Sequence, residues 1–344
     1  MAIRSSFEHA FLVTQINGQE TGMRSTAVDI VKLVAAAAVV WIHVTACEQS
    51  RELLPLCRFA VPFFTCAAVY FALHKAQSAR NSSLLAYSVQ RARRLYLPFL
   101  VWGVLYLLVR LLKHHFTGSG SPIVWSPALL LNGSAHHLWF LPFVCVLSIV
   151  AFTLSKRFGL PKAQDRGLWS LTFILLGVAL ALTSCPVTIQ PTEVPLTYFV
   201  DHAWDALPSA FFGAALFFLL SVIAPDVGLR WGVLFAGVIC LGLEFVHDDY
   251  LLFPHLAGAA FLFFTVTQPH RPWMEPLQPW AELAFVIYLV HLFFVEGLQM
   301  LSDRFGSDTS LPADLSIWAL SLVASAIAAK LLLRLRMLAW AFPR

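Results

Sequence analysis

Residues 28–47, VDIVKLVAAAAVVWIHVTAC, decide the fold of this chain. They form a mostly apolar run of about 20 residues, the length of helix that crosses a bilayer core about 30 Å thick. Similar runs follow along the chain and predict an all-α, polytopic integral membrane protein with about ten transmembrane helices. The predicted spans are residues 28–47, 56–73, 95–112, 138–154, 168–184, 206–224, 231–247, 250–267, 280–300 and 314–333.

The composition of the 344 residues excludes most other classes of protein. Hydrophobic residues make up 59% of the chain and charged residues 12%, whereas soluble proteins contain about 45–50% and about 25%. A soluble domain could not cover so much apolar surface, and the same figures exclude a disordered chain and a nucleic-acid-binding domain. The six cysteines show no C-x-x-C spacing, so no metal site is predicted.

The distribution of positive charge predicts the topology. Lys and Arg concentrate in the cytoplasmic loops of membrane proteins, and with the N-terminus inside, 17 of the 23 Lys and Arg residues fall in inner segments. This pattern predicts that both termini are cytoplasmic. Residues 1–22 lack a sustained apolar run and are interpreted as a cytoplasmic segment. The sequence leaves open whether translation starts at Met1 or at Met23. Residues 23–344 are expected to form a single membrane domain.

The first span contains three ionisable residues, each of which costs about 3 kcal/mol or more inside a bilayer and therefore needs a reason. At about 100° per residue, Lys32 and His43 differ by about 20° around the helix, and Asp29 lies about 60° from Lys32. A rise of about 1.5 Å per residue puts His43 about 16 Å along the axis from Lys32. Two interpretations are open: an interfacial Asp29–Lys32 ion pair with a packing histidine, or a functional stripe that faces the bundle interior.

Three arginines precede the third span. Arg91 and Arg94 are three residues apart and share a helical face at the cytoplasmic surface, with Arg93 beside them. They are interpreted either as ordinary positive-inside anchors or as a phosphate site, because guanidinium groups bind phosphate oxygens in a bidentate way.

Two further groups of polar and aromatic residues accompany later spans. His136, His137 and Trp139 lie at the start of the fourth span, and Tyr288 and His291 share one face of the ninth. Interfacial Trp is commonly a membrane anchor, and Tyr and His inside a bundle commonly form hydrogen bonds between helices. These structural roles and a role in substrate binding both remain open at this point.

Taken in order, these residues resemble the membrane acyltransferase-3 family, whose members acylate carbohydrates with acyl-coenzyme A. The family opens with an acidic residue, a basic residue three positions later and then a histidine, and Asp29, Lys32 and His43 match that pattern. The other matching motifs are VPFFTCAAVYF at residues 61–71, the Arg91–Arg94 pair, HLWFL at residues 137–141 and AFVIYLVH at residues 284–291.

The chain departs from the family pattern at two places. Ala68 and Val69 replace a Ser-Gly pair in the second span, and Ala284 replaces a Ser in the ninth. Loss of the glycine could alter close helix packing around the second span. The chain resembles the family members that consist of the membrane domain alone.

The resemblance implies a membrane-bound O-acyltransferase of the cell inner membrane. It implies transfer of an acyl group from cytoplasmic acyl-CoA, with acetyl-CoA expected, to a hydroxyl of a carbohydrate: a lipid-linked oligosaccharide, an exopolysaccharide or a periplasmic glucan. His43 is expected to act as the general base or to carry the acyl group itself. The expected site residues are His43, Lys32 and Asp29 for catalysis, Arg91, Arg94 and Arg93 for the donor, and His137, Trp139, Tyr288 and His291 for the acceptor.

A transporter or flippase is the alternative from a different functional class. In that case Lys32, His43 and acidic residues within the spans would form a substrate or proton path. The sequence shows no internal repeat of the kind common in transporters, and the arginine pair on the cytoplasmic side favours the enzyme. Consumption of acyl-CoA by the purified protein would separate the two.

Overall fold

The computed structural model describes residues 26–78, 83–117, 126–183, 196–246, 252–269, 271–305 and 309–334. Within these ranges the chain forms helices joined by turns and loops, with no strand. The prediction of an all-α protein is therefore confirmed for the described part of the chain. The segment 1–22, expected to be cytoplasmic, lies outside the described residues.

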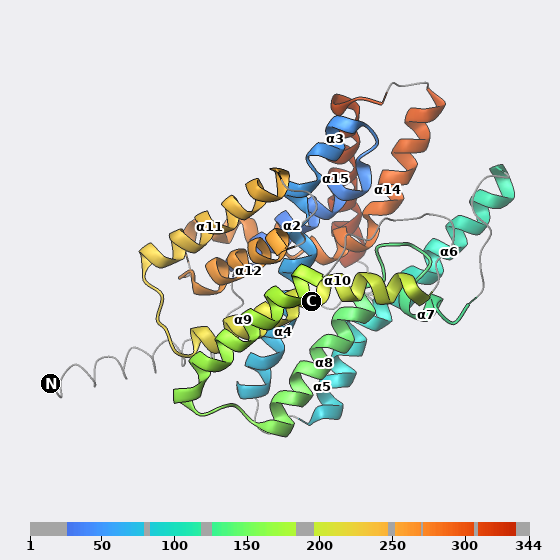
Figure 1. The fold of residues 1–344 in the computed structure, drawn as a ribbon. Coiled ribbons are helices and arrows are strands. Elements are labelled where there is room, and N and C mark those ends of the chain that lie inside the picture. The colour runs from blue at the N-terminus through green and yellow to red at the C-terminus, as the bar shows by residue number, and fades with distance from the viewer. Residues whose placement is uncertain are drawn as a thin grey trace.

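The helices form a bundle around α2 (Thr26–Val44). The other long helices are α4 (Ala60–Ser78), α6 (Leu97–Thr117), α8 (Phe140–Phe158), α9 (Arg166–Thr183), α10 (Leu196–Leu220), α11 (Val227–Val246), α12 (Leu252–Thr267), α14 (Ala284–Arg304) and α15 (Leu311–Arg334). The shorter helices are α3 (Glu48–Glu52), α5 (Leu84–Arg91), α7 (Leu129–Asn132) and α13 (Gln278–Ala281). Because α4, α12, α14 and α15 all contact it, α2 lies at the centre, whereas α6 extends away at one edge (Figure 1).

Each predicted span coincides with one of the long apolar helices. In the described residues, nine helices are long and apolar enough to cross a membrane. The remaining predicted span corresponds to α12, which has 16 residues. This length gives about 24 Å of helix, which is shorter than a bilayer core of about 30 Å. The chain is therefore a multi-pass membrane protein, while ten crossings and cytoplasmic placement of both termini remain predictions.

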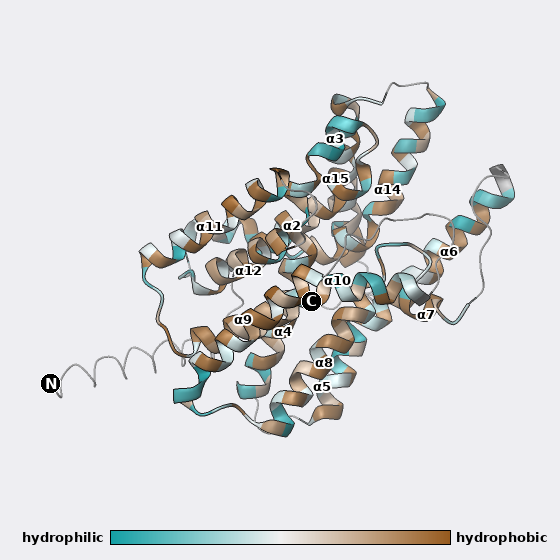
Figure 2. Ribbon diagram, viewed as in Figure 1, coloured by the Kyte–Doolittle hydropathy of each residue, from teal (hydrophilic) through white to brown (hydrophobic). Residues whose placement is uncertain are grey.

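The outer surface of the bundle is apolar. Figure 2 shows hydrophobic residues along the lengths of the helices and hydrophilic residues mainly at their ends. Large apolar side chains such as Leu175, Phe235 and Leu320 are more than half exposed. Soluble proteins rarely expose extended apolar surface, so these faces are suited to contact with lipid.

The sixth span begins earlier than the sequence predicted. Its helix α10 starts at Leu196 rather than at residue 206. Asp201, His202 and Asp205 lower the hydropathy of this first part, so the sequence pattern does not assign it to the apolar span. These residues are nevertheless compatible with a helix. The additional turns bring Tyr198 and His202 close to the end of the 133–139 segment, where they contribute to the site described below.

Close packing of α4 depends on glycines of the facing helices. A Cβ atom placed on Gly258 of α12 would lie 2.6 Å from the backbone nitrogen of Phe63, and one on Gly213 of α10 would lie 2.9 Å from Cα of Cys66. Small residues allow helix backbones to approach in this way. The absence of a glycine at Ala68–Val69 therefore leaves α4 closely packed, because the glycines stand on its neighbours.

Candidate active site

Four histidines from three segments meet at the C-terminal end of α2. His43 lies in the last turn of α2, His136 and His137 lie in the 133–139 segment before α8, and His291 lies in α14. Nδ1 of His43 is 2.9 Å from Nε2 of His136. The ring of His43 stacks on that of His291 with centroids 5.2 Å apart, and the centroids of His137 and His291 are 5.0 Å apart. We call these residues the histidine cluster.

The members of the histidine cluster differ in exposure. His137 and His291 are buried, His43 is half-buried and His136 is exposed. Gln299 of α14 holds the end of α2 beside them, because its Nε2 donates to the carbonyl of Val44 at 3.3 Å. The cluster therefore extends from the interior of the bundle to an accessible surface.

Hydrogen bonding determines which nitrogen of His291 carries the proton. Nδ1 lies 2.8 Å from the carbonyl oxygen of Tyr288, and since a carbonyl can only accept, Nδ1 donates. The neutral ring then has its lone pair on Nε2, a buried atom with no hydrogen-bond partner among the described residues. A buried polar atom without a partner costs about 1–3 kcal/mol, so Nε2 is suited to accept a hydrogen bond from a bound substrate.

The 133–139 segment is held in place by contacts with helices α6 and α10. Gly133 has a φ of +73° and a Cβ there would meet its neighbours at 2.8 Å, so only glycine suits this position. Arg110 of α6 donates to the carbonyl of Ser134 at 3.0 Å. Tyr198 of α10 donates to the carbonyl of His136, also at 3.0 Å. These contacts position the backbone that carries two of the four histidines.

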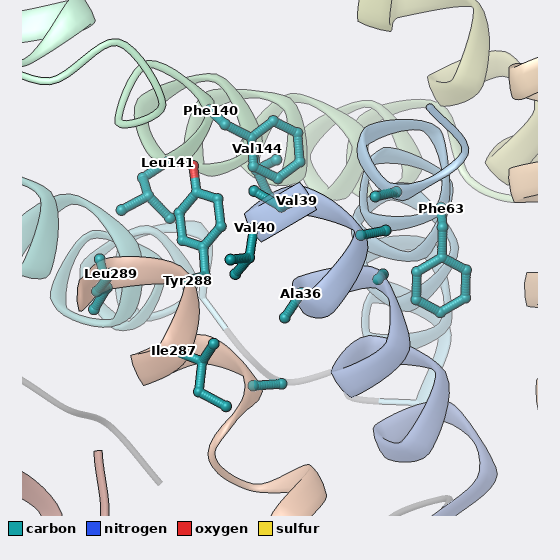
Figure 3. Packing of buried hydrophobic residues seen from close by; sticks show 14 of the residues in the cluster. Ala36, Val39, Val40, Phe63, Phe140, Leu141, Val144, Ile287, Tyr288 and Leu289 are labelled. Carbon is teal, nitrogen blue, oxygen red and sulfur yellow. The ribbon is translucent and has the colours of Figure 1, made fainter. Parts of the chain in front are cut away.

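Tyr288 joins α14 to the same segment. Its hydroxyl donates to the carbonyl oxygen of His137. Figure 3 shows its ring between apolar side chains of α2 and α8, near Val40 and Leu141. Tyr288 was predicted to bind the acceptor. In the structure its hydroxyl connects α14 to the 133–139 segment, which carries two histidines of the cluster.

His137 and Trp139 contribute to the interior of the site. His137 is buried, and its ring lies beside those of His291 and His43, with centroids 5.0 Å and 6.0 Å away, respectively. Trp139 is buried and its ring lies against His202 of α10, with centroids 5.2 Å apart. Both residues were predicted to bind the acceptor. In the structure both side chains are buried.

Asp29 and Lys32 form an ion pair near the start of α2. Nζ of Lys32 is 2.9 Å from Oδ1 of Asp29, which is buried, while the Lys32 side chain is 35% exposed. Lys32 and His43 are eleven positions apart, which corresponds to about 16 Å of helix. The structure thus shows the ion pair of the first interpretation and does not bring it into the histidine cluster.

A second polar site lies between the last turns of α4 and the second half of α5 with the helical turn that follows it. Arg91 is oriented there by its neighbour, because Nε donates to the hydroxyl of Tyr87 at 2.9 Å. Arg94 reaches the same pocket, whereas Arg93 does not line it. The pocket has a volume of about 320 Å³ and is lined by Phe71, His74, Lys75, Tyr87, Gln90, Arg91 and Arg94. We call it the cationic pocket.

A widened helical turn follows Arg91 and contains Arg93 and Arg94. Residues Ala92–Tyr96 form a π-helix, in which the N–H of Leu97 donates to the carbonyl of Ala92. Pro98 follows, and because it has no N–H and its ring crowds the carbonyl four residues earlier, it accounts for the widened turn. The regular helical spacing assumed from the sequence did not include this irregularity.

Some residues of these sites were not predicted to be functional. Lys75 was given no functional role from the sequence, yet it lines the cationic pocket. His136 was not among the expected site residues, yet it contacts His43. Glu244, a charged residue inside α11, forms an ion pair with Arg58 at 2.8 Å. Among the described His, Cys, Asp and Glu residues, no group of three or more could hold a metal ion.

The fold and these sites define a multi-pass membrane protein with a polar site inside its helical bundle. Residues 25–334 match the model of the acyltransferase-3 family, described as an acyltransferase domain, so the chain belongs to that family. It is also similar to the serine/alanine racemase of Enterococcus gallinarum, with 25% identity over 312 residues that cover 82% of this chain and 42% of that protein. The chain thus matches less than half the length of this relative. No solved structure gives a significant match.

Proposed function

We propose that this acyltransferase moves an acyl group from acyl-CoA on the cytoplasmic side of the cell inner membrane to a hydroxyl of a carbohydrate on the outer side. The donor is acetyl-CoA, and the acceptor is a lipid-linked oligosaccharide, an exopolysaccharide or a periplasmic glucan. The observation that carries the proposal is the histidine cluster, in which His43 is hydrogen-bonded at Nδ1 and lies against His291, whose buried Nε2 has no partner in the described part of the chain.

The cationic pocket supports a donor that carries phosphate groups. Lys75, Arg91 and Arg94 bring three positive charges to one pocket, and guanidinium groups bind phosphate oxygens through paired hydrogen bonds. The hydrogen bond from Arg91 to Tyr87 orients one of these groups in advance. CoA has its phosphates at one end and its thioester at the other, so the head would stay in the pocket while the pantetheine arm extends along α2 toward His43.

The proposed chemistry is a direct transfer with His43 as general base. The acceptor oxygen attacks the thioester carbon while its proton moves to Nε2 of His43. The carbon–sulfur bond breaks, and the proton passes from His43 to the sulfur of the departing CoA. The lone pair on Nε2 of His291 would accept a hydrogen bond from the acceptor and hold it in place.

Asp29 and Lys32 have a different place in this scheme. Their ion pair lies about 16 Å of helix away from His43, toward the N-terminal end of α2. This placement supports a role along the path of the donor arm rather than at the reacting thioester. Trp139 and Tyr288, which are buried in packing and hydrogen-bonding contacts, shape the acceptor side of the site.

The function is tested with the full chain reconstituted in liposomes. Acetyl-CoA and a bacterial extract of lipid-linked oligosaccharide are supplied, free CoA is measured with a thiol reagent, and the acceptor is analysed by mass spectrometry. We expect CoA release that depends on the acceptor, together with an acetylated product, and neither with His43→Gln. Movement of the oligosaccharide across the bilayer without consumption of acetyl-CoA would instead identify a flippase.

A further inference from the structure

His136 lies directly before the HLWFL motif and contacts His43. We infer that His136 is a positioning residue: it holds the imidazole of His43 in the tautomer with the proton on Nδ1, and it stabilises the imidazolium that forms during acyl transfer. The inference rests on the proposed function of His43 as the base. It concerns a residue outside the motifs that the chain shares with its family.

The geometry of the two rings supports a directed hydrogen bond. Nδ1 of His43 and Nε2 of His136 are 2.9 Å apart, a normal length for a nitrogen donor. The ring centroids are 4.7 Å apart and the planes are inclined by 65°, so the rings meet edge to face. Since Tyr198 holds the carbonyl of His136, the backbone that carries the His136 ring is itself fixed.

The other histidines of the cluster contact His43 in a different way. His291 stacks on His43 with planes inclined by only 28°, and its Nδ1 is engaged by the carbonyl of Tyr288. His137 meets the ring of His43 at a centroid distance of 6.0 Å. The hydrogen bond at 2.9 Å therefore makes His136 the neighbour that can orient His43 through a specific nitrogen.

Proton placement follows from the chemistry of a base. A neutral imidazole has one N–H and one lone pair. If Nδ1 of His43 donates to His136, Nε2 of His43 has a free lone pair and can take the proton of the acceptor hydroxyl. If the bond ran in the opposite direction, Nε2 of His43 would already be protonated and could not act as a base.

The same bond persists through the reaction. When His43 takes the proton, both of its nitrogens become donors, and a neutral His136 still accepts from Nδ1. The bond then has a charged donor and is stronger than before. His136 gains and loses no proton, because the proton passes from the acceptor hydroxyl to His43 and then to the sulfur of CoA.

Substitutions at His136 test this role in the reconstituted full-length protein. His136→Leu removes the acceptor for Nδ1, and His136→Gln retains a polar acceptor that reaches about as far. A lost hydrogen bond to a charged group predicts a fall in kcat of about 10- to 100-fold for His136→Leu, with unchanged KM for acetyl-CoA. His136→Gln should restore most of the rate, and His114→Leu, which changes an exposed histidine of α6, should behave as wild type.

The outcomes separate this inference from the proposed function. If His43→Gln is inactive while His136→Leu turns over normally, the base is retained and the positioning role is wrong. If His136→Gln is as slow as His136→Leu, the hydrogen bond is not what matters, and the inference also fails.

A second measurement does not depend on turnover. In protein with 15N-labelled histidine, the imidazole signals of His43 are identified by their loss in His43→Gln. We expect the proton of His43 on Nδ1 in the wild type and redistribution toward Nε2 in His136→Leu. A wild-type His43 protonated on Nε2 would overturn the inference, even in a preparation that shows no acyl transfer.

Discussion

The histidine cluster and the cationic pocket are assembled in opposite ways. The cluster draws its residues from α2, α14 and the 133–139 segment, which are far apart in sequence, and hydrogen bonds to backbone carbonyls fix several of them. The pocket draws its residues from the end of α4 and the neighbouring α5 and π-turn. A base must point at one atom, whereas a phosphate group presents several oxygens that neighbouring cationic side chains can bind together, and the two constructions suit those different demands.

The largest effect should come from the histidine cluster. His43→Gln keeps polarity and approximate size but cannot accept a proton, so turnover should fall by at least the roughly 10²–10⁴-fold typical of a lost general base. Binding of acetyl-CoA should survive, because the cationic pocket belongs to different helices. Turnover and equilibrium binding of acetyl-CoA, measured on the same preparation, check both halves of this prediction.

His291→Gln is the matched variant for this test. It changes His291, which stacks on His43. The buried Nε2 of His291 has no hydrogen-bond partner among the described residues, so His291 is an alternative base in the cluster. If His43→Gln retains near-normal turnover and His291→Gln is inactive, the assignment of the base to His43 is wrong and His291 takes its place.

The second effect concerns the cationic pocket. Arg91→Ala and Arg94→Ala each remove a charged contact to phosphate, worth about 1.5–3 kcal/mol, so apparent affinity for acetyl-CoA should fall about tenfold or more for each. At saturating donor, kcat should remain close to wild type because the histidine cluster is unchanged. Donor titrations of the double variant provide the measurement, and unchanged affinity would return both arginines to the role of topology anchors.

The contrast between the two sites also explains what the sequence could predict. Regularly spaced apolar runs located every long helix, since burial in lipid imposes a long apolar stretch whatever the neighbours. His43, His137 and His291 were named through separate motifs, but no periodicity indicates that α2 and α14 meet at these positions. Their meeting depends on tertiary packing of α14 against α2, where Gln299 of α14 donates to the carbonyl of Val44.

Local irregularities account for the remaining differences. The polar residues Asp201 and Asp205 obscured the true start of α10, because the hydropathy of a window does not measure helix formation. Pro98 was visible in the sequence, but the π-turn before it depends on how the backbone relieves the crowded carbonyl. The hydrogen bond between His43 and His136 carried no sequence signal beyond the adjacency of His136 and His137.

A smaller effect should follow from loosening the frame of the histidine cluster. Tyr288→Phe removes the hydroxyl that donates to the carbonyl of His137, a neutral hydrogen bond whose loss corresponds to about a 2- to 10-fold decrease in rate. The decrease should appear in kcat and not in KM for acetyl-CoA. Tyr96→Phe is the control, because it removes a similar hydroxyl contact, to the carbonyl of Leu130 at 3.1 Å, away from the cluster. An equal loss in both variants would show a general effect on folding.

The smallest effect should come from Arg93, and it is the sharpest test of how the cationic pocket is built. The sequence grouped Arg93 with Arg91 and Arg94, since all three carry the same charge at the same end of one helix. The structure separates them, because only Arg91 and Arg94 line the pocket.

If binding needs guanidinium groups directed at phosphate, Arg93→Ala should change donor affinity by no more than about twofold, the scale of a solvent-screened surface charge. If overall positive charge at the membrane surface is what attracts the donor, Arg93→Ala should weaken binding as much as Arg94→Ala does, and added salt should remove the difference from wild type. Donor titrations of the two single variants at low and high salt would therefore decide whether this pocket recognises phosphate by geometry or only by charge.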